Sequence, residues 1–356
     1  EFQIEHGTGY DSPYGADAFR RSVVEDYWQL DSDTGLGPQN VVAAVGGRDA
    51  LVKAYWAMMN VGMGRIGDVV AVSRVPWISY NWGPYGVGAN VVLMPGEPSD
   101  GWAYTPDGIR EGVAFTRQNG REVAALVITN PDNPTGHTIT PERQAELAHA
   151  ALEAGVHYVL FDWMYHYVTD EEPMDLNRFV QRFSPEERQQ LLFLDGITKS
   201  LGASNIRNAH LIAPEPLVKF INAQSSHAVI PHFYGQAVAM AAYKQGFREA
   251  AASIIEPTNA SRAVLRDLLE EHGFTYILGK GYYAFIEVGE WLRAAGMADS
   301  ADLGEYLAEQ WGVAIVPGVY FSTFGQDWVR FSYATPVERT RGAVERLVAG
   351  LEALRA

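Results

Sequence analysis

The chain has 356 residues, of which 47% are hydrophobic and 20% charged, a globular composition long enough for two domains or one large one. Its formal net charge of -16 disfavours nucleic acid and anionic membranes as partners. No apolar run could span a bilayer, no signal peptide is visible, and the absence of cysteine excludes disulfides and thiolate nucleophiles, so we expect a cytoplasmic protein.

Short apolar segments alternate with helical or turn-rich stretches from about residue 41 to residue 213. The predicted strands are Val69–Val75, Val91–Met94, Ala125–Thr129, Tyr158–Phe161, Leu191–Leu194 and His210–Ala213, and the segment Val41–Val45 precedes them. This alternation predicts an α/β domain with a mostly parallel sheet.

A different pattern follows near residue 250. Residues 248–272 predict a long helical run that Pro257 interrupts. The elements predicted after it are strands at Phe274–Leu278, Tyr282–Val288, Val313–Val316 and Trp328–Tyr333, and helices at Ala301–Trp311 and Val337–Leu354. They predict a smaller α+β domain, so we place a large domain at residues 1–250 and a small one at 251–356.

The segment from Gly62 to Gly67 spells G-x-G-x-x-G, the fingerprint of dinucleotide-binding folds. That fingerprint needs a strand before it and a helix after it, so that the helix N-terminus meets the pyrophosphate. Here a predicted helix precedes it and a predicted strand follows. We therefore interpret it as a helix-to-strand loop.

Chemically distinctive residues follow several of the predicted strands. Gly46 and Gly47 open a helix, where exposed N–H groups can bind an anion. Trp77 offers a flat ring that could stack on a planar cofactor or pack at a domain interface. The rigid turn Asn-Pro-Asp-Asn-Pro-Thr-Gly at residues 130–136 presents the amide of Asn133. Asp162 ends an apolar strand and needs a cationic partner, for which a pyridinium N–H would serve, unless it caps a helix.

Lys199 is the most informative of the five lysines. Lys53, Lys219 and Lys244 fall in predicted helices, where a lysine normally occupies the exposed face, and Lys280 lies between glycines in a turn. Only Lys199 follows a buried strand, where an amine can form Schiff bases with carbonyl compounds. Eight residues on, Arg207 could clamp the anion expected at Gly46 and Gly47.

These elements occur in an order that resembles one known family. They are Asn-Pro-Thr-Gly at 133–136, Asp-x-x-Tyr at 162–165, Lys199 with Arg207, Val-Pro-Gly at 316–318 and Val-Arg-Phe-Ser-Tyr-Ala at 329–334. From about Tyr10 to the final helix, the chain resembles the class I/II aminotransferases of the aspartate aminotransferase superfamily, fold type I. The resemblance implies pyridoxal 5'-phosphate as cofactor, a homodimer with shared active sites, and ping-pong transfer of an amino group between an L-amino acid and a 2-oxo acid.

The resemblance also implies a role for each matching residue. Lys199 resembles the Schiff-base lysine, and Asp162 the partner of the pyridine nitrogen. The remaining matches are Tyr165 and Asn133 for the phenolic oxygen, Trp77 and Met164 for the two ring faces, Gly46, Gly47, Arg48, Thr198 and Arg207 for the phosphate, Arg330, with Asn133 and Trp77, for the substrate, and Tyr10 for the partner subunit's phosphate. Gly196 departs from the family, which often has serine there, and Thr198 could replace the lost phosphate donor.

Two alternatives remain open from the sequence. A lyase, cyclase or racemase on the same fold could use extra acid–base groups, for which Trp163, His166, His227 and His232 are candidates. A non-catalytic regulator would carry a basic DNA-binding unit, and none is evident. Hydrolase motifs such as His-Glu-x-x-His and Gly-x-Ser-x-Gly are absent, and we predict no metal site.

Overall fold

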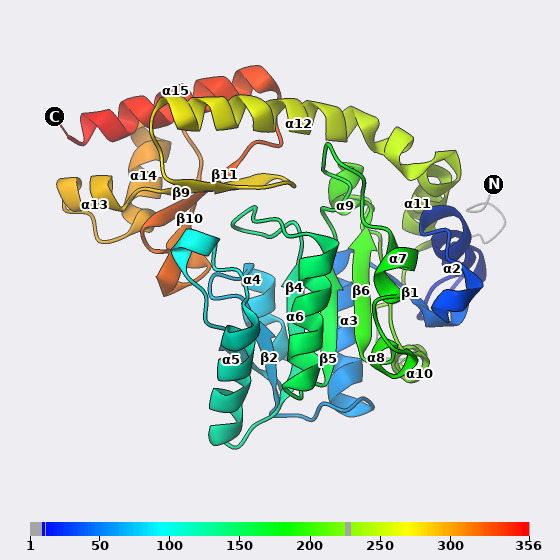
Figure 1. The fold of residues 1–356 in the computed structure, drawn as a ribbon. Coiled ribbons are helices and arrows are strands. Elements are labelled where there is room, and N and C mark those ends of the chain that lie inside the picture. Colours follow the sequence, from blue (N-terminus) through cyan, green and yellow to red (C-terminus); the bar gives the residue numbers. More distant parts are fainter. Residues whose placement is uncertain (1–8, 11, 225–228, 356) are drawn as a thin grey trace.

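The computed structural model describes residues 9–10, 12–224 and 229–355. Two sheets organise this part of the chain, and Figure 1 shows them one above the other. The larger has seven strands in the order β1-β7-β6-β5-β4-β2-β3, and the smaller has four in the order β10-β11-β9-β8. The predicted α/β fold with a smaller α+β part is confirmed.

The large sheet is parallel except at β7. Its strands are β1 (Val41–Ala44), β2 (Val69–Val72), β3 (Asn90–Leu93), β4 (Val123–Thr129), β5 (Tyr158–Asp162), β6 (Leu191–Gly196) and β7 (Ala209–Ile212). Because β7 runs antiparallel to both β6 and β1, its first residue lies at the edge where the other strands end. Polar residues that follow β1, β2, β4, β5 and β6, or precede β7, therefore gather along one edge.

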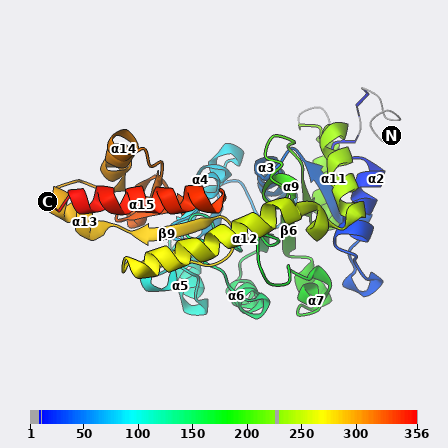
Figure 2. The ribbon, with the colours of Figure 1, turned by 90° about the horizontal axis from the view of Figure 1, so that it is seen from above.

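Both faces of the large sheet are covered by helices, which explains its nearly continuous apolar strands. Alternate residues of one strand enter different cores: Val41 and Ala43 pack on one face, Val42 and Ala44 on the other. Figure 2 shows α5, α6 and α7 on one side and α3 and α4 on the other. The helices in this part are α2 (Asp17–Ser22), α3 (Gly47–Asn60), α4 (Ile78–Trp82), α5 (Pro106–Gln118), α6 (Pro141–Glu153), α7 (Leu176–Val180), α8 (Pro185–Arg188), α9 (Ile197–Ser200), α10 (Glu215–Ala223) and α11 (Phe233–Gln245).

The small sheet is antiparallel and packs against long helices. Its strands are β8 (Tyr276–Leu278), β9 (Tyr283–Glu287), β10 (Val316–Pro317) and β11 (Trp328–Ser332), and its helices are α13 (Gly289–Ala295), α14 (Ser300–Trp311) and α15 (Val337–Ala353). Leu265 and Leu269 from the preceding helix α12 (Phe247–Glu271) join the same core as Leu347. Figure 2 shows α12 and α15 lying along each other.

Helix α12 corrects one prediction, because it runs without interruption from residue 247 to residue 271 with Pro257 inside it. A proline removes one backbone hydrogen bond and usually breaks or kinks a helix. Ser253, whose carbonyl loses its donor, is exposed, as is Pro257, so water can satisfy that carbonyl. The domain boundary placed near residue 250 would fall in the first turn of this helix and remains a prediction.

Two further expectations concern the segment around α3. The G-x-G-x-x-G segment does join α3 to β2 as an irregular loop, as predicted. Lys53, expected on an exposed helix face, is instead buried. Its amine pairs with Asp49 one turn earlier at 2.8 Å and donates to the Ala43 carbonyl at 3.3 Å, which offsets the cost of burying the charge.

Among the described residues, no helix combines the length and apolarity that crossing a membrane requires.

Candidate active site

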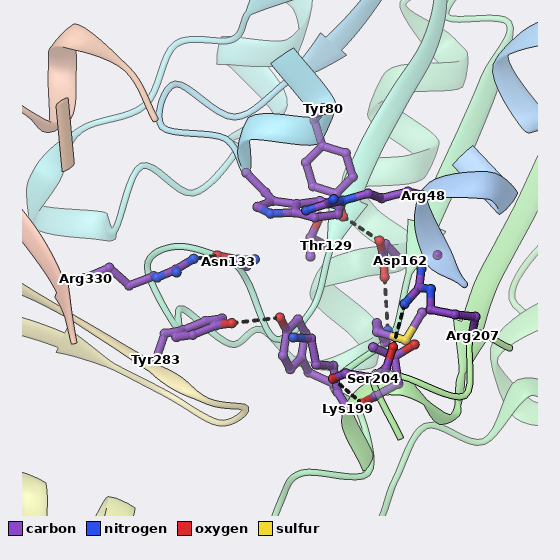
Figure 3. Close-up of a pocket in the computed structure, with 15 residues that line it drawn as sticks. Arg48, Tyr80, Thr129, Asn133, Asp162, Lys199, Ser204, Arg207, Tyr283 and Arg330 are labelled. Atoms are coloured by element: carbon purple, nitrogen blue, oxygen red, sulfur yellow. Dashed lines mark hydrogen bonds between the residues drawn. The ribbon is translucent and has the colours of Figure 1, made fainter. Parts of the chain in front are cut away.

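A cavity of about 470 Å³ lies at the edge where the large-sheet strands end, facing the small sheet (Figure 3). Most of the predicted site residues line it. They are Gly47, Arg48, Trp77, Asn133, Asp162, Met164, Tyr165, Thr198, Lys199, Arg207 and Arg330. The cavity also exposes Tyr80, Thr129, Ser204 and Tyr283, which the sequence analysis did not identify.

One end of the cavity suits a compact anion. Gly47 starts the 14-residue helix α3, so its backbone N–H and the positive end of the helix dipole lie beside the Arg207 guanidinium. Arg207 is held by donation to the carbonyls of Val45 (3.1 Å) and Ser204 (3.0 Å). The Oγ1 of Thr198 is buried without a hydrogen-bond partner in the described chain. A cation and a helix N-terminus therefore lie together there, and an unpaired hydroxyl lines the same cavity.

Gly46 does not line the cavity, but the arginine depends on it. Its φ is +83°, and a Cβ at this position would collide with the Arg207 guanidinium. At Gly196, where the resemblance suggested serine, a Cβ would come within 2.7 Å of the Ala209 Cα and 2.8 Å of the Asn208 carbonyl oxygen. Glycine at 196 is thus required by the close approach of β7. Thr198 and Ser204 are the two lining residues near the end of β6 that carry hydroxyls, and the role of Thr198 as a phosphate donor remains a prediction.

The middle of the cavity is a slot with a buried carboxylate at its base. Asp162 accepts hydrogen bonds from the Tyr80 hydroxyl (2.6 Å) and the Met164 backbone N–H (3.1 Å), and Thr129 in turn donates to Tyr80 (2.9 Å). No ion pair joins Asp162 to a described residue. Burial raises the pKa of Asp162 to about 6, because the two hydrogen bonds only partly offset the loss of water. The carboxylate therefore still lacks the cationic partner that the sequence analysis expected.

Aromatic rings and one thioether form the walls of this slot. Trp77 and Met164 both line it, and the Trp77 ring contacts Tyr80 edge-on with centroids 5.3 Å apart. The Arg48 guanidinium lies over the Trp77 ring at 5.5 Å (Figure 3). Tyr165 is buried, and burial raises the pKa of its hydroxyl well above the ordinary value, so it remains protonated.

Lys199 enters the cavity from the short helix α9, which follows β6 directly. Its Nζ lies 5.7 Å from the centroids of both the Tyr165 and Tyr282 rings, and the Tyr282 hydroxyl donates to the Lys199 carbonyl at 2.5 Å. No ion pair involves Lys199 within the described ranges. The amine is therefore free to react in a cavity that also contains a buried carboxylate.

The other end of the cavity presents a second cation. Arg330, on β11, donates from Nη1 to the Asn133 side-chain oxygen (2.8 Å), and its guanidinium lies 4.2 Å from the centroid of the Tyr283 ring. Its Nε is buried and has no hydrogen-bond partner, and no described carboxylate pairs with it. Arg330 is thus placed to bind an anionic group at the end opposite Arg207 (Figure 3).

Several candidate residues lie elsewhere. Tyr10 is 95% exposed and does not line the cavity. Trp163 and His166 are buried outside the cavity lining, and the His232 ring caps α11 by accepting the Gly235 N–H at 2.9 Å. His227 lies outside the described residues. The described cavity thus contains none of the extra acid–base groups suggested for a lyase or racemase.

Comparison with known proteins agrees with this geometry. The family model for aminotransferase class I and II matches residues 3–347. The chain is 27% identical to an aspartate aminotransferase of Geobacillus stearothermophilus, over 98% of this chain and 85% of that protein. It is also 27% identical to an aspartate/prephenate aminotransferase of Thermus thermophilus, over 95% and 82% respectively.

Solved structures give the same result. An aspartate aminotransferase from Thermus thermophilus with maleate superposes with a TM-score of 0.80 at 26% identity, covering 98% of this chain and 85% of that one. An aromatic aminotransferase from Pyrococcus horikoshii has the same fold, with a TM-score of 0.83 at 22% identity and coverage of 98% and 90%.

Proposed function

The chain belongs to the class I and II aminotransferases, which are pyridoxal-phosphate-dependent transaminases, and we propose that Lys199 and Asp162 carry out this chemistry here. The observation behind the proposal is that a free amine and a buried carboxylate without a protein cation line one cavity. The reaction moves an amino group between an L-amino acid and a 2-oxo acid in two half-reactions.

The cavity fits the cofactor at each chemically distinct part. Gly47, Thr198 and Arg207 would hold the phosphate. An anion there would be stabilised by the helix dipole and by the guanidinium, and it would accept a hydrogen bond from the unpaired Thr198 hydroxyl. Asp162 would meet the ring nitrogen, whose proton supplies the missing cation. Trp77 and Met164 would contact the ring faces, while Tyr165 and Asn133 would bind the phenolic oxygen.

When bound, the cofactor supplies an electron-withdrawing ring that weakens the Cα–H bond of the amino donor. Asp162 would keep the ring nitrogen protonated, which would strengthen that withdrawal. The Lys199 amine would hold the cofactor covalently and, once displaced by the donor amine, its Nζ would accept the proton from Cα and deliver it to the aldehyde carbon of the cofactor. Arg330, whose Nε has no partner in the described chain, would bind the donor carboxylate, which would fix the direction of the Cα–H bond and favour proton removal over decarboxylation.

The balance of products tests this reaction. We expect the reconstituted enzyme to form one 2-oxo acid from the donor for each amino acid formed from the acceptor. Without the acceptor, the reaction should stop after a single turnover. Chromatography of both product pairs, over a panel of amino donors, measures the ratio. Sustained release of a 2-oxo acid without an acceptor would instead identify a lyase, and conversion of the donor to its enantiomer a racemase.

We also propose that two chains form a homodimer with shared active sites. Exposed apolar side chains gather on α3, the loop after it, α4 and the adjoining turn: Val52, Val61, Met63, Ile66, Ile78, Trp82 and Tyr85. Ile66 and Trp82 are 69% and 68% exposed, and the Trp82 and Tyr85 rings lie 6.1 Å apart. Exposed apolar side chains on neighbouring elements are characteristic of a subunit interface. Tyr10 would reach the phosphate of the neighbouring subunit's cofactor across it.

Charge placed on this surface should separate the subunits. The double variant Ile66→Glu, Trp82→Glu is expected to weaken self-association by about 100-fold or more, because burying unpaired carboxylates is costly. Sedimentation velocity across a concentration series measures the change. Phe115→Glu provides the matched control, since Phe115 is 59% exposed on α5, on the other side of the sheet in Figure 2. If the double variant sediments like the wild type, this surface is not the interface.

A cytoplasmic location, suggested by the lack of cysteine, remains a prediction.

A further inference from the structure

A buried polar network lies beside the core on one face of the large sheet, whereas Met164 and Tyr165 of the cavity belong to the core on the other face. Its central residue is Asp195 of β6. Phe193 and Ile197, two positions before and after it, enter one core, and Leu194 enters the other. Asp195 is 1% exposed, and the partners His166 and Tyr27 are 5% and 6% exposed. The aminotransferase chemistry described above uses none of these three residues.

The Asp195 carboxylate is satisfied by three donors from separate parts of the chain. The Tyr27 hydroxyl, at the end of a π-helical turn (Val23–Tyr27), donates to Oδ2, and His166 Nε2 lies 2.7 Å from the same oxygen. The Gly196 N–H donates to Oδ1 at 2.6 Å. Hydrogen bonds of this number and length stabilise a buried carboxylate without a neighbouring cation.

The histidines of the network do not neutralise that charge. His166 Nδ1 accepts the Met174 backbone N–H at 3.0 Å, so its ring proton is on Nε2 and is donated to Asp195. His210 lies directly opposite Asp195 on β7, and its Nε2 accepts from Trp28 Nε1 at 2.9 Å. Burial lowers the pKa of His210 to about 4, which keeps this ring neutral.

The network joins the two segments that carry the catalytic groups. His166 belongs to the irregular segment after β5, directly after Tyr165, and its ring is fixed at both nitrogens. Asp195 binds the N–H of Gly196, where β6 passes into the helix that bears Lys199. Paired strands already fix β5 beside β6 up to Asp162 and Leu194, and beyond that point the imidazole–carboxylate contact continues the connection.

We propose that the Tyr27–His166–Asp195 network is a positioning unit that fixes Tyr165 and Lys199 relative to each other at the cofactor. This inference rests on the proposed function. Apolar side chains could fill the same space, but they lack the directional bonds that hold two segments in one geometry. The negative charge of Asp195 also contributes, after burial, to raising the pKa of Asp162.

Substitution of the network in the full-length, cofactor-loaded protein tests the proposal. His166→Phe and Tyr27→Phe are expected to lower kcat about 10-fold or more with little change in KM, since small displacements of catalytic groups are costly. They should also shift, by about one pH unit, the titration midpoint of the visible absorbance of the Lys199-bound cofactor. His166→Gln keeps an N–H donor near the Nε2 position and should restore most of both properties.

The matched control is His149→Phe. His149 makes a similar imidazole–carboxylate contact, to Glu187 at 3.0 Å, but between α6 and α8 and away from the cavity. Its replacement should leave the absorbance midpoint and kcat unchanged, whatever it does to thermal stability. Asp195→Asn should give the largest shift in the absorbance midpoint. If Asp195→Asn does not fold, Tyr27→Phe, which removes only one hydroxyl, still tests the proposal.

Two failures can be told apart. If the wild type itself shows no lysine-bound cofactor and no transamination, the proposed function is wrong. If the wild type shows both, and folded Tyr27→Phe and His166→Phe proteins match it in kcat, absorbance midpoint and cofactor affinity, the network has only a structural role and the positioning proposal is overturned.

Discussion

The Lys199→Ala protein is expected to lose transamination by roughly 10²–10⁴-fold, the contribution typical of a positioned acid–base group, and to lose its covalent bond to the cofactor. The phosphate corner at Gly47 and Arg207 does not involve the lysine, so pyridoxal phosphate should still bind reversibly. Single-turnover kinetics with the best donor, together with equilibrium dialysis of the cofactor, separate the two effects.

The other lysines make this prediction specific. Three of them form ion pairs: Lys53 with Asp49, Lys219 with Glu215, and Lys280 with Asp170 and Glu171. The fourth, Lys244, is exposed on α11. Borohydride reduction of the loaded wild type, followed by peptide mapping, should therefore place the cofactor on Lys199 alone. Lys244→Ala is the control and should retain wild-type turnover. A label on another lysine, or turnover in Lys199→Ala within tenfold of wild type, would contradict the assignment.

The position of Lys199 could be predicted from the sequence because it depends on local order. In a parallel sheet the strand ends share one edge, so residues that follow apolar strands, such as Asp162 and Lys199, must lie near one another. The same rule could have identified Thr129, the last residue of β4, and Tyr80, one turn after Trp77.

Tyr283 illustrates what the sequence could not provide. It lies on β9 of the small sheet and reaches the cavity only because that sheet stands over the strand ends, where its ring lies under Arg330. The residue pattern of β9 predicts which of its side chains are buried in the small sheet, but it does not predict that this sheet faces the strand ends of the large one. Arg330 itself was identified by family resemblance and not by its spacing.

The burial of Lys53 and the uninterrupted helix at Pro257 escaped prediction for a related reason. Propensity describes a residue in an average environment, whereas these two depend on a particular neighbour and a particular exposure. A carboxylate one turn earlier makes the buried amine of Lys53 tolerable, and solvent at Ser253 makes the proline tolerable. The Tyr27–His166–Asp195 network likewise joins residues up to 168 positions apart that no local pattern connects.

Asp162→Asn is the second change with a large expected effect, a fall in kcat of roughly 10²–10³-fold. Asparagine keeps the size of the side chain and an acceptor for the Tyr80 hydroxyl, but it removes the one negative charge that lines the described cavity. Without that charge the ring nitrogen is not held protonated and withdraws less electron density from Cα. Steady-state kinetics with saturating cofactor measure the loss.

Tyr80→Phe separates the charge from the hydrogen bond. It removes one neutral donor to Asp162 and leaves the carboxylate in place, so its effect should stay within about tenfold, in keeping with about 1 kcal/mol for such a bond. Equal losses in Tyr80→Phe and Asp162→Asn would mean that orientation of the side chain, and not its charge, is what the reaction requires.

The pH dependence of stability provides a readout independent of turnover. Burial raises the pKa of Asp162 from an ordinary 3.8 to about 6 in the cofactor-free protein, so between these values the folded state binds more protons than the unfolded state. The unfolding free energy of wild type relative to Asp162→Asn should therefore fall as pH rises from about 4 to about 6, and be flat above. Asp132, whose pKa burial also raises to about 6, is present in both proteins and largely cancels.

Binding of pyridoxal phosphate should remove this step in stability, the fall in relative unfolding free energy as the pH rises from about 4 to about 6. The reason is that a protonated ring nitrogen beside Asp162 favours the ionised carboxylate and lowers the pKa of Asp162. Urea unfolding at a series of pH values, with and without the cofactor, measures the difference. A step that persists unchanged in the loaded protein would mean that Asp162 does not meet the ring nitrogen, even if the Asp162→Asn variant is inactive. The two readouts thus test the contact and its chemical consequence separately.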